Sequence, residues 1–444
     1  MKVTRLFQLD RARSGALLAR TLLAAMLACP MLPTTAQAAS DLPADTWVGT
    51  FGRAQAGPPG DADIQTLTDQ TLRMIVHTSI GGSRLRVRLS NEFGTTPLKI
   101  GAAHVALRQG LGGAQIVSGS DQVLKFNGSP SATIAAGELA LSDPIDLPFD
   151  ALSDLVVSMH LPEATLLSTG NPNALQLCYV STPGNFVDAA NFPTQSTTGF
   201  WPFVTGVDVV GKGSAIVALG DAFTGGKGSI TDTNYRWPDL LARRLQATTD
   251  SDAFYKSLGV VNLGISGNRL LANGAYGALA GRNGLDRFDR DVLGTAGVRH
   301  LVVQLGINDI LGSGKDESVT ASALIGGYRQ LIGRAHARGI SVFGATLLPF
   351  QGFTGESKDF EATRQALNTW IRTGNELDGV IDFDRAVGDP DNPLRLLPAY
   401  DSGDHMYPNN RGYEALGNAV PLELFRALRE GTGEPLPKAK AARR

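Results

Sequence analysis

The chain has 444 residues, of which 43% are hydrophobic and 18% are charged, and its formal net charge is −2 at pH 7. A net charge so close to zero, without a long basic or acidic run, gives no electrostatic reason to expect binding to nucleic acid or to a membrane surface. A chain of this length and apolar content can bury a large core and is long enough for two domains.

The first 38 residues have the layout of a secretory signal peptide. Basic residues extend to Arg20, an apolar run covers residues 22–32, and small residues lead to a cleavage site after Ala38. The apolar run has about eleven residues, fewer than the roughly twenty that a membrane-spanning helix needs. Cys29 suggests lipoprotein processing as an alternative, although the residues before it fit that pattern poorly. We therefore expect a secreted or periplasmic protein.

After cleavage the chain would retain a single cysteine, Cys178, so no intramolecular disulfide is expected. Cys178 lies in the apolar run 175–180, where a lone thiol is usually a small buried hydrophobic side chain. The folded state is then expected to depend on its apolar core.

Residues 45–210 show many short β-like runs separated by Gly, Pro, Asn and Ser. Residues 83–90 and 154–161 alternate polar and apolar side chains with the period of a strand. Further strands are expected at 71–78, 98–107, 139–142 and 174–181. Many short strands without intervening helices predict an all-β sandwich domain, of jelly-roll type.

The pattern changes near residue 211, and from 212 to 430 buried strands alternate with amphipathic helices. Strands are expected at 215–220, 260–263, 300–305, 340–347 and 380–383, and helices at 236–247, 318–338, 357–374 and 410–429. This alternation predicts an α/β domain with a parallel sheet between two helical layers. Ligands of such sheets bind at the carboxyl ends of the strands. The last residues, 431–444, are expected to form a flexible tail.

Four short segments fall at those strand ends: GDAFT at 220–224, NLGISGN at 262–268, GIND at 306–309 and DSGDHMYPN at 401–409. In order and spacing they resemble the four sequence blocks of the SGNH hydrolases, also called GDSL-type esterases. The β region before them resembles the N-terminal module of a two-domain branch of that family. The resemblance implies a three-layer, flavodoxin-like fold and hydrolysis of carboxylic esters without a metal or cofactor.

The resemblance also implies a role for each of five positions. Residue 222 would be the serine nucleophile, but it is Ala222, which has no oxygen to attack with. The backbone N–H of Gly267 and the side-chain amide of Asn308 would complete an oxyanion hole with the N–H of residue 222. Asp404 would orient a histidine three residues later, where Tyr407 stands instead. Two members of the triad are therefore absent.

Nearby side chains are poor candidates to replace the missing nucleophile and base. A phenol has a reference pKa of about 10, so Tyr407 is a poor base at neutral pH. His405 adjoins Asp404, but neighbouring side chains are expected to diverge. Thr224 is expected to cap the following turn and Ser229 to lie in a loop, while Asp221 is expected to fix the turn through backbone hydrogen bonds.

Other candidate groups are less distinctive. Arg269 has two open interpretations, as a residue lining the cleft or as part of an ion pair. The histidines at 77, 104, 160, 300 and 336 show no spacing typical of metal ligands. No phosphate-binding glycine-rich loop occurs.

Three hypotheses follow. The first is an SGNH-fold protein that binds a small glycan or lipid ester without turning it over. The second is a working hydrolase that uses unorthodox groups, and the third is an inactivated form of an active esterase. The loop 350–357 and the interdomain surface are expected to set ligand specificity, and the sequence leaves the ligand and the oligomeric state open.

Overall fold

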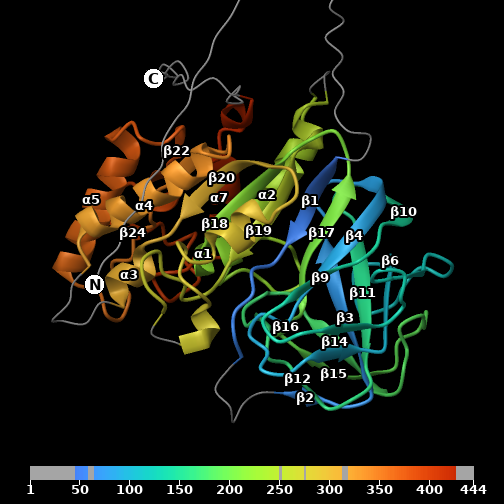
Figure 1. The fold of residues 1–444 in the computed structure, drawn as a ribbon. Coiled ribbons are helices and arrows are strands. Elements are labelled where there is room, and N and C mark those ends of the chain that lie inside the picture. The colour runs from blue at the N-terminus through green and yellow to red at the C-terminus, as the bar shows by residue number, and fades with distance from the viewer. Residues whose placement is uncertain (1–45, 59–64, 250–252, 275–276, 313–318, 427–444) are drawn as a thin grey trace, which may run out of the picture. The chain divides into compact units, whose positions relative to one another are not determined.

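The computed structural model describes residues 46–58, 65–249, 253–274, 277–312 and 319–426 (Figure 1). The predicted signal peptide at 1–38, including Cys29, and the predicted tail at 431–444 lie outside the described residues. One compact unit begins at Leu42 and contains both the β region and the α/β region. The boundary between the two predicted domains therefore stays a prediction. Within the described ranges, no helix has the length and apolar character needed to span a membrane.

The N-terminal half consists largely of strands in antiparallel sheets, as predicted. One sheet contains β1 (Trp47–Gly52), β17 (Val204–Val210), β4 (Gly82–Ser90) and β10 (Ile145–Phe149) in this order, with β9 (Leu139–Leu141) also paired to β4. The other contains β15 (Thr194–Thr198), β14 (Cys178–Pro183), β3 (Gln70–His77), β11 (Asp154–Leu161), β6 (Ala102–Leu107) and β7 (Gln122–Val123). Short pairs complete the region: β2 (Thr66–Leu67) with β12 (Thr165–Leu166), β5 (Leu98–Ile100) with β8 (Ala132–Ile134), and β13 (Gly170–Asn171) with β16 (Trp201–Pro202). The consecutive strands β3 and β4 lie in different sheets, as expected for a sandwich.

Two predicted strands of this region differ from the structure. The expected strand at 98–107 is divided into β5 and β6 at Gly101, where an added Cβ would lie 2.9 Å from Nδ1 of His160. The expected strand at 174–181 begins only at Cys178. Leu175 has a φ of 52°, which is incompatible with an extended strand. Cys178 itself is free and fully buried, as predicted.

The C-terminal half contains a parallel sheet with helices around it. The strand order is β19 (Gly259–Gly264), β18 (Ala215–Gly220), β20 (Val298–Gln304), β21 (Ser341–Ala345) and β22 (Gly379–Ile381). The helices are α1 (Ala222–Gly225), α2 (Trp237–Gln246), α3 (Ile307–Leu311), α4 (Ala321–His336), α5 (Lys358–Thr373), α6 (Phe383–Val387) and α7 (Asn410–Ala419). A short antiparallel pair, β23 (Gly388–Asp389) and β24 (Asn392–Leu396), follows α6.

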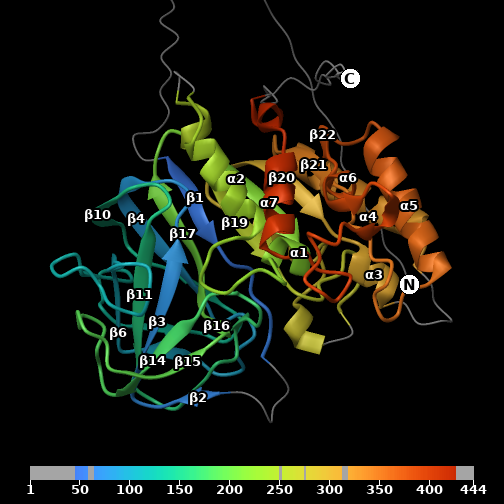
Figure 2. The same cartoon turned by 180° about the vertical axis from the view of Figure 1, so that it is seen from behind.

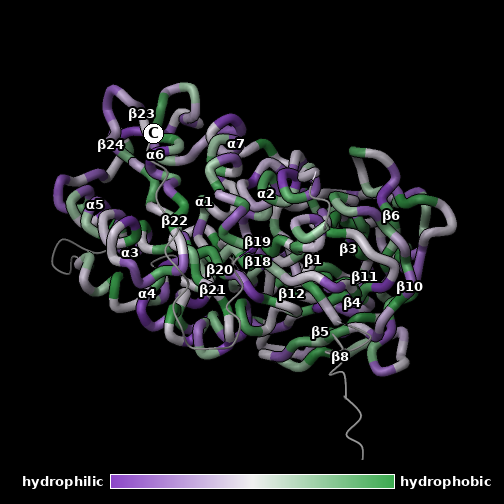
Figure 3. The backbone as a smooth tube through the Cα atoms, turned by 90° about the horizontal axis from the view of Figure 1, so that it is seen from above, coloured by the Kyte–Doolittle hydropathy of each residue, from purple (hydrophilic) through white to green (hydrophobic). Residues whose placement is uncertain are grey.

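Helices cover both faces of the parallel sheet. Seen from above, α2 and α7 lie on one side of the row of strands and α4 lies on the other (Figure 3). The half-turn between Figures 1 and 2 brings first one layer and then the other to the front. All six residues of β18 are buried, because apolar side chains meet helices on both faces. This arrangement confirms the predicted α/β fold.

Side-chain caps explain where several helices begin. The side chains of Thr320, Ser357 and Asn409 accept hydrogen bonds from N–H groups in the first turns of α4, α5 and α7. The predicted helix at 410–429 is too long, because α7 ends at Ala419. Pro421 restricts the residue before it to extended backbone, and Val420 has φ −71° and ψ 116°.

Hydrogen bonds join the β region to both ends of the parallel sheet. At the carboxyl end, Nδ2 of Asn171 donates to the carbonyl oxygen of Gly264, the last residue of β19, at 3.1 Å. At the amino end, the amide N–H of Gly49 donates to the carbonyl of Ala296, just before β20, at 2.9 Å. The first contact brings the loop after β13 to the edge of the sheet where the four predicted site segments lie.

Candidate active site

The first site segment follows β18 and turns into the short helix α1. Asp221 caps this helix, since its Oδ1 accepts a 3.0 Å hydrogen bond from the amide N–H of Phe223, in the turn-fixing role predicted for it. Ala222 is the first residue of α1 and is only 2% exposed. A methyl side chain cannot attack a carbonyl carbon, so position 222 can offer a ligand no more than its amide N–H.

The two other predicted oxyanion donors differ in their surroundings. Gly267 has a φ of 77°, a turn conformation that a residue with a side chain would adopt only with strain. Nδ2 of Asn308 donates to Oδ2 of Asp221 at 3.2 Å and to the carbonyl oxygen of Asn268 at 3.0 Å. Because a side-chain amide has two N–H donors, both donors of Asn308 are engaged. A ligand oxygen must displace one of these partners to bind there.

Asp404 organises the loop at 401–409. Its Oδ1 accepts hydrogen bonds from the amide N–H groups of Met406, at 3.0 Å, and Tyr407, at 2.8 Å. The hydroxyl of Ser402 donates to the same oxygen at 3.2 Å. Three donors on one carboxylate oxygen fix the backbone of this loop and so hold residue 407 in place.

The ring of Tyr407 connects the fourth segment to the first. It packs against Phe223 with 5.2 Å between ring centroids. The ammonium of Lys227 also lies over this ring, with Nζ 4.5 Å from the ring centroid, and makes a cation–π contact. The tyrosine ring therefore takes part in packing at the place where the family resemblance would put the catalytic base.

Three of the five predicted site residues line one cavity of about 480 Å³: Gly267, Asn308 and Tyr407. Ala222 and Asp404 are not among its lining residues. The loop at 350–357, which was predicted to set specificity, contributes residues 353–355. The β region contributes Pro172 and Asn173 from the loop after β13. The volume is in the usual range for a pocket that holds a small molecule.

His405 does not face this cavity. Its Nδ1 lies 2.6 Å from Oδ2 of Asp401, and its backbone has a φ of 61°. It lines a different hollow together with Arg395 and Gly352. The expected divergence from Asp404 is therefore observed, and His405 cannot reach a group at position 222 from this place.

The two hydroxyls considered as substitute nucleophiles also lie outside the cavity lining. Thr224 is fully buried within α1, and its Oγ1 donates to Oε1 of Gln304 at 3.2 Å. The prediction that Thr224 caps the helix was wrong, because Asp221 occupies the cap. Ser229 is 8% exposed and also does not line the cavity. Ser266, which the sequence did not single out, does line it.

Two basic side chains face the same cavity. Arg269 lines it, which decides between its two interpretations, and Nη2 donates to the carbonyl oxygen of Gly312 at 2.9 Å. Lys227 was missed by sequence reasoning. The local sequence places it five residues after position 222, but its contact with Tyr407 depends on segments about 180 residues apart and has no local signal.

The buried carboxylates beside the cavity have perturbed pKa values. Burial raises the pKa of Asp221 to about 7; the N–H of Phe223 opposes this shift, and the nearby Asp309 adds to it. Burial raises the pKa of Asp309 to about 6, against the N–H donors of Leu270 and Leu271. An ordinary aspartate in an unfolded chain has a pKa of about 3.9. Between about pH 4 and 7 the folded protein therefore holds more protons at these two sites than the unfolded chain.

This difference predicts a pH dependence of stability. The contribution of each such carboxylate to the free energy of unfolding should fall as the pH rises from about 4 to its folded pKa, by up to about 1.4 kcal/mol per pH unit. His300, whose pKa burial lowers to about 4, contributes in the opposite direction. Compared with the unchanged protein, the Asp221→Asn variant should therefore gain relative stability between pH 4.5 and pH 7.5, because its side chain cannot ionise. Urea unfolding of both proteins at the two pH values measures this. Asp146→Asn, at a carboxylate 84% exposed, is the control and should keep the pH dependence of the unchanged protein. An identical pH dependence in the Asp221 variant would contradict the prediction.

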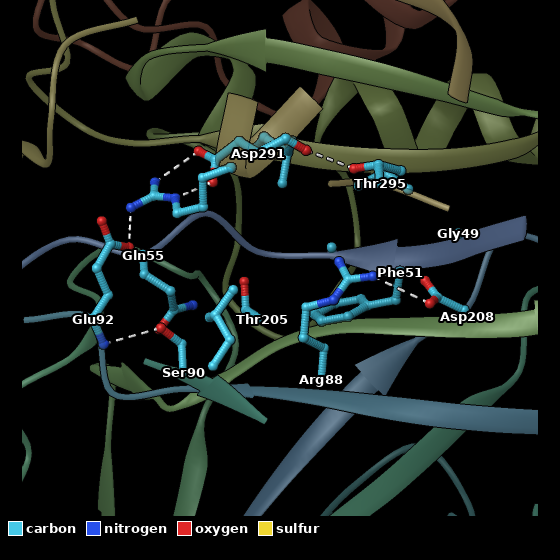
Figure 4. A pocket seen from close by; sticks show the side chains of 15 residues that line it. Gly49, Phe51, Gln55, Arg88, Ser90, Glu92, Thr205, Asp208, Asp291 and Thr295 are labelled. Carbon is cyan, nitrogen blue, oxygen red and sulfur yellow. Dashed lines mark hydrogen bonds and ion pairs between the residues drawn. The ribbon is translucent and has the colours of Figure 1, made fainter. Parts of the chain in front are cut away.

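A second hollow lies between β1, β4 and β19 and contains none of the five predicted site residues (Figure 4). Its volume of about 20 Å³ suits little more than a water molecule. Arg290 joins its walls by ion pairs to Glu92 and to Asp291. On the β region side, Arg88 pairs with Asp208 at 3.2 Å. We interpret this hollow as a structural contact and not as a ligand site.

Comparison with known proteins gives one family match and several similar solved structures. The profile of the GDSL-like lipase/acylhydrolase family matches residues 218–415. A GDSL-like lipase from Bacteroides thetaiotaomicron is 20% identical, with 48% of this chain and 89% of the other covered and a TM-score of 0.36. A carbohydrate acetylesterase from Sinorhizobium meliloti is 14% identical, with coverages of 46% and 95% and a TM-score of 0.34. A family two carbohydrate esterase from Cellvibrio japonicus is 12% identical, with coverages of 86% and 95% and a TM-score of 0.34. A search of the curated proteins gives no match.

Proposed function

We propose that this protein, whose residues 218–415 match the GDSL-like lipase/acylhydrolase family, binds a small acyl or carbohydrate ester without hydrolysing it at an appreciable rate. The ester binds in the cavity lined by Gly267, Asn308 and Tyr407. The observation that carries the proposal is the composition of the cavity. None of the described residues that line it is a histidine, an aspartate or a glutamate. An ester bound there meets N–H donors but no general base.

The chemistry of the lost groups supports the proposed impairment. A serine hydrolase needs a hydroxyl and a base within hydrogen-bonding reach of each other. The chain has Ala222 at the first position and Tyr407 at the second. Removal of a nucleophile alone costs about 10⁶ in rate in a comparable triad, and the remaining acceleration comes from binding and the oxyanion hole.

The alternative is an active carboxylic-ester hydrolase that uses other groups. It would require a hydroxyl activated by a base inside the cavity. Ser266 offers a hydroxyl there, but no described base faces it, and His405 lines a separate hollow. We therefore prefer the binding function. From its first 38 residues we also propose that the protein is exported to the periplasm or the medium.

Binding without turnover can be tested with an acetylated methyl glucoside and saturation-transfer NMR. We expect saturation transfer to the sugar ester and an intact acetyl signal after several hours. Thr354→Trp should abolish the transfer, because a large ring at this exposed cavity residue occupies the ligand space. Thr369→Trp, on the exposed face of α5, is the matched control and should bind normally. Rapid loss of the acetyl group would refute the impairment, and normal binding by Thr354→Trp would refute the assigned site.

A further inference from the structure

The charged side chains that line the cavity are all positive. Its described lining includes two cations, Lys227 and Arg269, and no anionic side chain. Among the described residues, neither cation forms an ion pair within 4.0 Å, although the charge of Arg269 does act on the nearby carboxylate of Asp309 and opposes the rise in its pKa. The whole chain carries a net charge of −2, so this local excess of positive charge does not reflect the overall composition.

Hydrogen bonds fix the backbone of Lys227, and a ring contact supports its ammonium. The amide N–H of Lys227 donates to the carbonyl of Ala222 at 2.9 Å, and the hydroxyl of Tyr413 donates to the carbonyl of Lys227 at 2.7 Å. The ring of Tyr407 then supports Nζ at 4.5 Å from its centroid. A histidine at 407 would present a partly positive ring to this ammonium, whereas a neutral phenol ring attracts it. The substitution at 407 therefore suits a lysine in the cavity.

The guanidinium of Arg269 is fixed by a hydrogen bond to the backbone. One of its five N–H donors bonds to the carbonyl oxygen of Gly312 at 2.9 Å, and no other donor bonds to a described residue. A side chain at Gly312 would prevent this position, because its Cβ would lie 1.9 Å from Nη2 of Arg269. The remaining donors have the planar geometry that matches a carboxylate.

From these contacts we propose that the ligand of this cavity is an anionic ester, one that carries a carboxylate in addition to its ester group. Lys227 and Arg269 bind the carboxylate, and the ester lies toward Gly267. The proposal rests on the proposed binding function and specifies its ligand class. An unpaired cation in a cavity favours a ligand of opposite charge, and charged hydrogen bonds discriminate more strongly than neutral ones.

Monomethyl succinate and dimethyl succinate provide matched probes, since both contain a methyl ester and only the first carries a charge at pH 7. Titration calorimetry in 50 mM salt should show the monoester binding about tenfold or more tightly than the diester. Raising the salt concentration to 500 mM should weaken the monoester more than the diester, because exposed charges are screened.

Variants separate this inference from the proposed function. Lys227→Met and Arg269→Met should each reduce the ratio of monoester affinity to diester affinity. Lys256→Met removes an exposed lysine outside the cavity lining and should preserve the preference. Equal binding of the two esters by the unchanged protein would overturn the anionic ligand class alone. Absence of binding by both esters would overturn this inference alone if the acetylated glucoside still shows saturation transfer. It would overturn the binding function as well if the glucoside also fails to bind.

Discussion

The Ala222→Ser/Tyr407→His double variant is expected to hydrolyse a small aryl acetate at least about 10³-fold faster than the unchanged protein. Ala222→Ser alone supplies a hydroxyl that stays protonated without a base, and Tyr407→His alone supplies a base with nothing to activate. Members of a triad act as a unit, so the double change should exceed the product of the two single changes. Initial rates of aryl acetate hydrolysis by the four proteins measure this.

The geometry around Asp404 supports this expectation. Only Oδ1 of Asp404 accepts hydrogen bonds from described residues, so Oδ2 is left for an imidazole N–H at position 407. Addition of Asp404→Ala to the double variant is the control and should remove most of the gained activity, by about 10²-fold or more. An inert but folded double variant would show that the cavity has lost more than two groups. Turnover by the unchanged protein that disappears in Ser266→Ala would favour the unorthodox hydrolase.

Replacement of Arg287 by methionine is expected to destabilise the protein by about 3–5 kcal/mol, because it removes the hydrogen bonds to three buried oxygens and one of the two arginine partners of Asp291. Arg287 is fully buried, and its guanidinium donates to the carbonyls of Gly220 and Leu263, both at 2.9 Å, and to Oδ1 of Asn268 at 3.0 Å. It also pairs with Asp291 at 2.8 Å. One side chain thus joins the carboxyl ends of β18 and β19 to the oxyanion segment.

Urea unfolding of Arg287→Met should show this loss as a lower midpoint. Arg329→Met is the matched control. Its guanidinium also pairs with a carboxylate, Glu376, but is 58% exposed, so its removal should change the unfolding midpoint little. Equal midpoints for the two variants would contradict the structural role of Arg287. Because Arg287 lies beside Asn268, we also expect the variant to bind the acetylated sugar more weakly where it remains folded.

The fold was largely predictable because its signals are local. The buried strand at 215–220 is a continuous apolar run, and its predicted bounds coincide with β18. The same holds for the strand at 154–161, which is β11. Errors arose where a backbone dihedral delayed the start of a strand, as at Leu175, or where a proline ended a helix early, as at Val420. The order of the four segments also predicted that all five site residues would meet at one cleft, because parallel strands end at one edge. Gly267, Asn308 and Tyr407 line the cavity, whereas Ala222 and Asp404 are not among its lining residues.

The sequence by itself determined the α/β fold with its preceding β region, the family resemblance, and the absence of a nucleophile at 222 and a histidine at 407. Only the tertiary structure decided which neighbours these residues have. In the folded protein, Lys227 contacts the ring of Tyr407, and both donors of Asn308 form hydrogen bonds. His405 bonds to Asp401, and Asn173 lines the cavity. These contacts join segments from separate strands and loops. Their geometry depends on how the whole core packs, and periodicity, composition and short motifs report only what lies close along the chain.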